Sequence, residues 1–184
     1  MGASREDVWL ALSELWLDNQ LQDSSHRHIA RVLLASGLPV EELRLIYLEE
    51  VAPLLWLNHW GVAGVWEGFD PLWLNSGCRR NQARRASRWH RWRCRLLRRP
   101  MTYAAEPEWR QVLRQMDELR RELHVANQKL AMHAQTLSDQ IAEQKKVIEG
   151  LRDGAEVGNI DVAQKRLATL EAMATAQGKA AAAT

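Results

Sequence analysis

Residues 107–130 read PEWRQVLRQMDELRRELHVANQKL. Their apolar side chains recur at alternating steps of three and four residues, at Trp109, Val112, Met116, Leu119, Leu123, Ala126 and Leu130. Such heptad spacing is typical of a helix that buries one apolar seam against a partner helix. It predicts a long α-helix with a coiled-coil seam.

The seam extends beyond Leu130 with one irregularity. Ile141 follows Leu130 by eleven residues, as in a stutter, and Ile148 resumes the register. The residues assigned to the seam are Val112, Met116, Leu119, Leu123, Leu130, Leu137, Ile141 and Ile148.

The predicted helix is long for a compact domain. A helix over 107–152 would measure roughly 70 Å, so we expect it to project or to find a partner. Gly154 and Gly158 predict a turn, and a second apolar stripe starts at Ile160. The long helix can therefore fold back as a helical hairpin.

Three shorter helices are predicted in the N-terminal part. Ser4 and Asp7 form a capping box before a helix over about 5–18. A second helix ends at Gly37, placed as a left-handed cap, and Pro39 occupies the first turn of a third. Pro53 ends or kinks this third helix.

The remaining N-terminal residues complete the predicted core. The acidic residues of the third helix, Glu41, Glu42, Glu49 and Glu50, are expected on its outer surface, and the tryptophan-rich stretch 51–66 at the centre of the core. Asp70 and Pro71 predict the start of a short helical turn. Because no alternating strand pattern appears, the chain is predicted to be all-α.

These patterns divide the 184 residues into four parts. They are an acidic, tryptophan-rich helical core over 1–77, an arginine-rich segment over 78–106 that packs on this core or links from it, a long helix with a return helix over 107–173, and a flexible tail over 174–184. The prediction is a compact helical domain followed by a long helix.

Charge is distributed very unevenly along the chain. The formal net charge is +2, but residues 1–77 carry four arginines against eleven acidic residues. The stretch from Cys78 to Arg99 holds ten arginines and no acidic residue, with Trp89 and Trp92 among them. This stretch, called the arginine block below, is the predicted contact surface for an anionic partner.

The N-terminal part also resembles a known family. The matching motifs are VWLALSEL (8–15), IARVL (29–33), Ser36-Gly37, EEVAP (49–53) and AGVWEGFD (63–70). The family is a bacterial, all-helical domain of unknown function, and the resemblance covers about residues 5–115. It implies a helical domain and assigns no activity. The helical extension after residue 120 lies outside it.

The arginine block has two interpretations. In one, an exposed helix uses arginines to hold phosphates and indoles to stack on bases or to rest at a lipid interface. In the other, Trp89, Trp92, Leu96 and Leu97 dock on the core while the arginines reach the domain's own glutamates and water. The candidate binding residues are Arg84, Arg85, Arg88, Trp89, Arg91, Trp92, Arg95 and Arg98.

Other candidate sites are weaker. His26, His28, His90 and His133 are too scattered to predict a metal site. Histidines are expected at the surface, and His133, at a seam position, is interpreted as a polar residue that sets the register. Cys78 and Cys94 lie near arginines that would lower a thiol pKa. Glu49 and Glu50 are expected to form ion pairs with the arginine block rather than to act as catalytic acids, since no nucleophile motif accompanies them. No catalytic residue, cofactor or metal is predicted.

The sequence favours an interaction or adaptor protein in the cytoplasm over an enzyme. Its partner would be a protein or a second copy, bound through the seam and the arginine block. A nucleic-acid-binding accessory protein is the first alternative, and an acidic-faced immunity or inhibitor protein is the second. A membrane is the least favoured partner, and no small-molecule ligand is indicated.

Overall fold

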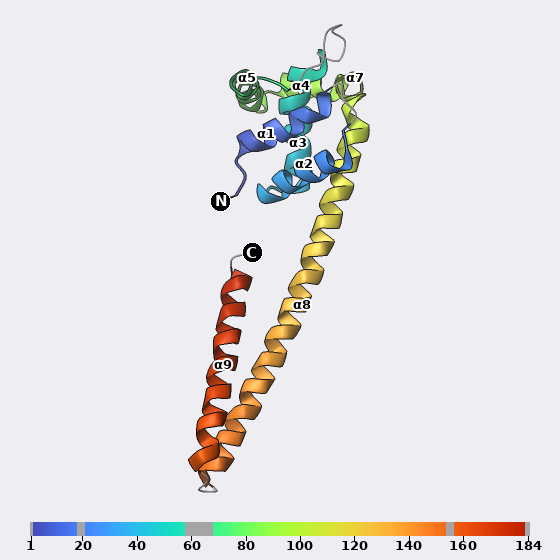
Figure 1. The fold of residues 1–184 in the computed structure, drawn as a ribbon. Coiled ribbons are helices and arrows are strands. Elements are labelled where there is room, and N and C mark those ends of the chain that lie inside the picture. The colour runs from blue at the N-terminus through green and yellow to red at the C-terminus, as the bar shows by residue number, and fades with distance from the viewer. Residues whose placement is uncertain (1, 18–20, 58–67, 154–156, 183–184) are drawn as a thin grey trace. The chain divides into compact units, whose positions relative to one another are not determined.

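A computed structural model describes residues 2–17, 21–57, 68–153 and 157–182, and all regular elements in these ranges are helical (Figure 1). The all-α prediction is confirmed. The chain forms two compact units, Met1–Leu119 and Arg120–Thr184. The predicted boundaries at 77/78 and 106/107 both fall inside the first unit.

The first helix, α1, spans Arg5–Ser13 and begins with the predicted capping box. The Ser4 side chain accepts from the Asp7 amide, and the Asp7 carboxylate accepts from the Ser4 amide at 2.7 Å. The helix is shorter than the predicted 5–18, because Ser13 Oγ donates to the Leu10 carbonyl and the chain tightens into a single 3₁₀ turn, η1, at Glu14–Trp16.

The next two helices confirm the predicted glycine cap and correct the position of a proline. Helix α2 spans Asp23–Ala35, and Gly37 follows it with a φ of 66°. This left-handed conformation favours glycine because it has no Cβ. Helix α3 spans Val40–Leu45 with Pro39 as its N-cap, so Pro39 lies just before the first turn rather than inside it.

Pro53 does not end the predicted third helix, but a π-helical turn, called the kink below, interrupts the α-helix just before this proline. Helix α3 continues as a π-helical turn, η2 (Ile46–Val51), and then as α4 (Ala52–Leu55), which has Pro53 in its first turn. Proline lacks an amide hydrogen and crowds the carbonyl four residues earlier, here that of Glu49. The wider turn just before Pro53 accommodates that conflict.

The stretch after the kink is part of the core as far as it is described. Val51, Ala52 and Leu55 are fully buried. Trp56 is half-buried against the core, whereas Trp60 and Trp66 lie outside the described residues.

Asp70 caps helix α5 as predicted, with its carboxylate accepting from the Trp73 amide at 2.7 Å. However, α5 spans Pro71–Arg84, so a helix of fourteen residues replaces the predicted short turn. Two further helices, α6 (Arg88–Leu96) and α7 (Arg98–Thr102), complete the arginine block.

An aromatic stack occupies the centre of the first unit. Tyr47 lies between Trp16 and Trp109, with ring centroids 5.2 Å and 5.0 Å away. Trp109 belongs to helix α8, which spans Ala105–Asp153. Val112 and Met116, on the next turns of α8, are also fully buried in this core. These two predicted seam residues therefore pack inside the domain and not in a coiled coil.

The second unit is a helical hairpin. Helix α9 spans Val157–Ala182, and Figure 1 shows it beside the C-terminal part of α8. Lys145 on α8 pairs with Glu171 on α9 at 3.3 Å. Leu137 is buried, Leu130, Ile141 and Ile148 are half-buried, and Leu123 is exposed. The sequence predicted a flexible tail from residue 174, but α9 continues to Ala182, in keeping with the high helix propensity of alanine.

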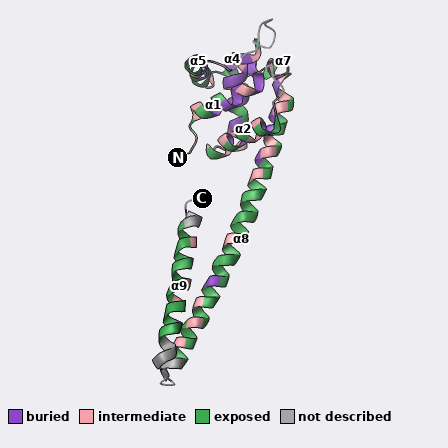
Figure 2. Ribbon diagram, viewed as in Figure 1, coloured by how far each residue is buried: buried purple, intermediate pink, exposed green. Residues whose placement is uncertain are grey.

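Most surface of the hairpin faces water. Figure 2 shows α9 and the adjoining part of α8 as largely exposed, whereas buried residues gather in the helices of the first unit. Among the helices described, none is both long enough and apolar enough to cross a membrane.

Candidate functional site

Helix α6 carries the centre of the arginine block and packs on the domain by one face. His90 and Cys94, four residues apart, are buried, and Leu97 packs partly against the core. The buried His90 corrects the expectation of surface histidines. The other positions of α6 remain free to face solvent.

A hydrogen bond from His90 fastens α6 to the kink before Pro53. The carbonyl of Glu49 lies four residues before Pro53, which has no amide hydrogen to offer it. His90 Nε2 bonds this oxygen at 2.9 Å. Since a carbonyl only accepts, this ring nitrogen carries the hydrogen. The kink thus creates the acceptor that positions α6.

Trp89 and Trp92 stand out from the domain. Their side chains are 68% and 52% exposed, and their rings stack on one another with centroids 4.8 Å apart. Leu96, one turn further along α6, is exposed as well. The interpretation in which Trp89, Trp92, Leu96 and Leu97 all dock on the core is therefore wrong, because only Leu97 of these four packs against it.

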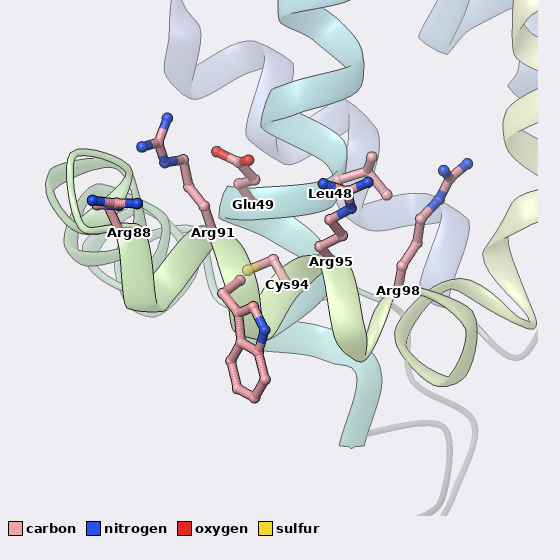
Figure 3. A pocket seen from close by; sticks show the side chains of 8 residues that line it. Leu48, Glu49, Arg88, Arg91, Cys94, Arg95 and Arg98 are labelled. Atoms are coloured by element: carbon pink, nitrogen blue, oxygen red, sulfur yellow. The ribbon is translucent and has the colours of Figure 1, made fainter.

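Four arginines line a hollow beside the two tryptophans. The hollow has a volume of about 470 Å³ and is lined by Leu48, Glu49, Arg88, Arg91, Trp92, Cys94, Arg95 and Arg98. Figure 3 shows the arginine side chains extending from α6 and the start of α7 toward the side on which Glu49 and Leu48 lie. Guanidinium groups gathered in this way attract an anion.

A second hollow adjoins the first through Arg98. It has a volume of about 550 Å³ and is lined by Arg98, Arg99, Thr102, Tyr103, Glu106, Pro107 and Arg110. Tyr103 is 82% exposed. We call the exposed side chains of α6 and the two hollows together the Arg/Trp surface.

Arg85 belongs to a different environment from the other candidate arginines. Helix α5 ends at Arg84 and α6 begins at Arg88, so Arg85 does not share a helical face with Trp89 and Trp92. Its guanidinium group turns inward and pairs with Glu42 at 2.7 Å, Glu50 at 2.8 Å and Glu49 at 3.4 Å. Arg85 is therefore a structural residue and is no longer counted among the binding residues of the Arg/Trp surface.

Glu50 is the centre of this interior network. It is fully buried and accepts hydrogen bonds from Arg5, Arg85 and the indole nitrogen of Trp9, the last at 2.6 Å. This position corrects the expectation that Glu50 lies on an outer acidic surface. The expected pairing of Glu49 or Glu50 with the arginine block is confirmed.

Glu42 shares the two arginines with Glu50. Hydrogen bonds from Arg85 and Arg5 lower the pKa of Glu42 from 4.5 to about 2, against the opposing effect of burial. A carboxyl group with a lower pKa in the folded state stabilises the fold above its unfolded pKa. This contribution is lost as the pH falls from 4.5 toward 2.

As far as the structure describes the chain, few arginines of the block are paired with carboxylates. Arg79 pairs with Glu6, and Arg85 belongs to the interior network. Among the residues that the structure describes, no carboxylate pairs with the other eight arginines, which are Arg80, Arg84, Arg88, Arg91, Arg93, Arg95, Arg98 and Arg99. Within the described residues, only Arg79 and Arg85 of the block are paired with carboxylates.

The remaining candidates do not form a reactive centre. Burial, with a smaller effect from Glu50, raises the pKa of the Cys78 thiol to about 12, and burial also raises the pKa of Cys94 against the opposing effect of Arg93. His26 is buried and pairs with Glu108. Within the described parts of the chain, no three His, Cys, Asp or Glu side chains cluster as a metal site would require.

The sequence prediction missed the second hollow. Arg99, Tyr103, Glu106 and Arg110 were not assigned to a site, although they recur at steps of four, three and four residues. In the structure these residues lie on two helices, with Arg99 on α7, Glu106 and Arg110 on α8, and Tyr103 in the turn between them. Extending the arginine block along the chain to its next arginine, Arg110, would have included all four.

Comparison with known proteins identifies one region of the chain. The family described as a domain of unknown function, DUF7079, matches residues 3–115. The match includes the Arg/Trp surface and the first turns of α8, and it stops before the hairpin. Neither the curated proteins nor the solved structures contain a match to the chain.

Proposed function

We propose that this chain, which belongs to the DUF7079 family of domains of unknown function, is a non-enzymatic interaction protein that binds an anionic macromolecule. The observation that carries this proposal is the stacked, exposed pair of Trp89 and Trp92 beside arginines with which no described carboxylate pairs. Tryptophan is enriched at interfaces, and a contiguous exposed apolar patch marks an interaction site.

The energetic cost of the surface supports a binding role. Arginines gathered in one hollow repel one another, and a bound anion relieves this repulsion. Arginine also forms paired hydrogen bonds to phosphate or carboxylate groups, which lysine does not. No lysine occurs before Lys129, so the cations of the first unit are all arginines apart from histidine and the N-terminus.

Replacing Arg88 and Arg91 by alanine tests this proposal. We expect the double variant to elute from a heparin column at lower salt than the wild type. Each lost contact should reduce the slope of log affinity against log salt by about 0.7 to 0.9. Both side chains are exposed, so the fold should be unchanged.

The matched control replaces Arg31 on α2 and Arg80 on α5, which are exposed and line neither hollow. This variant removes the same charge and should retain heparin almost as the wild type does. Equal losses in the two variants would mean that net charge alone governs binding, and the proposed surface would be abandoned.

Self-association through the hairpin is a second candidate function. The observation that favours it is Leu123, a seam residue that is 52% exposed, with Met132 at 69%. Leu119 is less suitable for a test because it packs against the domain core. Leu123 is the sharper target.

We expect Leu123→Glu to lower the mass measured by light scattering if the seam joins two copies. The charge would be buried in the interface, at a cost of several kcal/mol. Leu123→Ala serves as the milder variant. An identical monomeric mass for the wild type and for Leu123→Glu would remove self-association.

Two further aspects belong to the same proposal. The two cysteines are free, which suits the reducing cytoplasm. The immunity or inhibitor alternative is weakened, since Glu6, Glu42, Glu49 and Glu50 pair with arginines of their own unit and are less available to a basic target.

A further inference from the structure

The shape of the Arg/Trp surface identifies the chemistry of its partner. We propose that the anion is single-stranded nucleic acid, with phosphates on the arginines of α6 and bases on Trp89 and Trp92. This inference rests on the proposed anion-binding function and goes beyond it. It also predicts that the bases, and not charge alone, contribute to affinity.

Two parallel rows of side chains run along α6. Arg88, Arg91 and Arg95 follow one another at steps of three and four residues, as do Trp89, Trp92 and Leu96. Because successive residues differ by about 100° around a helix, the second row lies beside the first. A single strand presents the same pattern, with a line of phosphates next to a line of bases.

The arginine row continues beyond α6. Arg98 begins α7 and lines both hollows, and Arg99 and Arg110 line the second. Repeating phosphates could pair with guanidinium groups along this whole line, whereas carboxylates of a folded protein occur at irregular spacing. Tyr103, 82% exposed beside the second hollow, offers another ring on which a base can stack.

The arrangement favours a strand over a duplex or a membrane. In a duplex the faces of the bases already stack on one another, so the indoles would have no base to contact. The arginines line concave hollows, which a flat bilayer enters less well than a flexible strand does. RNA and DNA share the required phosphates and bases.

Glu49 limits the affinity of the first hollow. Its carboxylate lines the hollow among the four arginines and is paired with Arg85 at 3.4 Å. The negative charge opposes a phosphate, so the pairing with Arg85 reduces but does not remove this repulsion.

The test uses fluorescently labelled oligothymidylate of about 12 nucleotides and measures its affinity for the full chain. Parallel titrations use oligouridylate, a duplex of the same length, inorganic polyphosphate of equal charge, polyglutamate and phosphatidylserine vesicles. We expect both single strands to bind more tightly than polyphosphate and to quench tryptophan emission. The ratio of the two single-strand affinities distinguishes RNA from DNA.

Two matched pairs of variants separate stacking from apolar contact. Trp89→Leu/Trp92→Leu keeps apolar side chains but removes the rings, and should weaken single-strand binding by roughly 5- to 100-fold. Trp89→Phe/Trp92→Phe keeps aromatic rings and should retain most of the affinity. Neither pair should alter polyphosphate binding. Trp73→Ala, which removes an exposed ring on α5, is the control.

Each alternative outcome is decisive. Equal affinity for single strands and polyphosphate, unaffected by the leucine variant, would overturn the nucleic-acid inference and leave anion binding intact. Tighter binding of the duplex, polyglutamate or vesicles would overturn it in favour of that partner. Failure to bind any of these anions or heparin would overturn the proposed function as well.

Discussion

Replacing Glu50 by alanine is expected to lower the free energy of unfolding of the first unit by about 3 to 5 kcal/mol. Glu50 is fully buried and holds Arg5, Arg85 and the Trp9 indole together. Its removal leaves Glu42 as the one carboxylate partner of Arg5 among the described residues, leaves Arg85 with Glu42 and the more distant Glu49, and leaves the buried Trp9 nitrogen without its acceptor. Unpaired buried groups of this kind are costly.

Urea unfolding followed by tryptophan emission measures this effect. All nine tryptophans lie between residues 9 and 109, so the signal reports the first unit and not the hairpin. Glu50→Gln, which keeps the shape and loses the charge, should fall between the alanine variant and the wild type. Glu41→Ala, an exposed glutamate of the same helix, is the control and should have almost no effect.

Glu50 is not part of the Arg/Trp surface, but it affects that surface indirectly. It holds Arg85, which connects α5 to the kinked helix that anchors α6 through His90. A loss of stability no larger than that of Glu41→Ala would contradict the central role given to Glu50. The folded fraction of the Glu50 variants must therefore be known before their binding is interpreted.

Trp109→Ala is expected to cost about 3 to 5 kcal/mol of stability. Trp109 is 1% exposed, and its ring stacks on Tyr47 at 5.0 Å with an angle of 9° between the ring planes. Deleting it leaves a cavity where α8 meets the core and also removes the stacking interaction. We expect a lower urea midpoint, measured by the emission of the remaining tryptophans.

Two variants make this prediction specific. Trp109→Phe should cost much less, because it keeps a stacked ring and removes an indole nitrogen that is buried without a hydrogen-bond partner. Trp89→Ala removes an identical side chain from an exposed position and should leave stability nearly unchanged. Similar midpoints for Trp109→Ala and Trp89→Ala would disprove the assignment of Trp109 to the core.

Trp109 shows how far periodicity alone can be interpreted. A spacing of three and four residues demonstrates that one face of a helix is apolar, but it does not identify what covers that face. Along α8, the face is covered by the domain at Val112 and Met116, is buried at Leu137 within the hairpin, and is exposed at Leu123. The same heptad spacing therefore occurs in three environments, which are the domain core, the interior of the hairpin and the solvent-exposed surface.

The arginine block shows a similar limit. Its composition correctly indicated a strongly basic surface, and charge counting anticipated ion pairs with Glu49 or Glu50. It did not indicate which arginine would turn inward. Arg85 does so because a helix break between Arg84 and Arg88 separates it from the row on α6.

Local signals in the sequence were sufficient to predict several features of the fold. The capping box at Ser4, the left-handed Gly37, the Asp70 cap and the helical class all depend on residues a few positions apart, whose interactions form within one turn of chain. The tertiary structure alone decided that Glu50 is buried, that Arg85 leaves the surface and that Trp89 and Trp92 remain on it. These outcomes depend on contacts between residues more than thirty positions apart, such as Asn81 and His90 bonding the carbonyls of Glu50 and Glu49. Burial and pairing are properties of the packed helices, which no local spacing encodes.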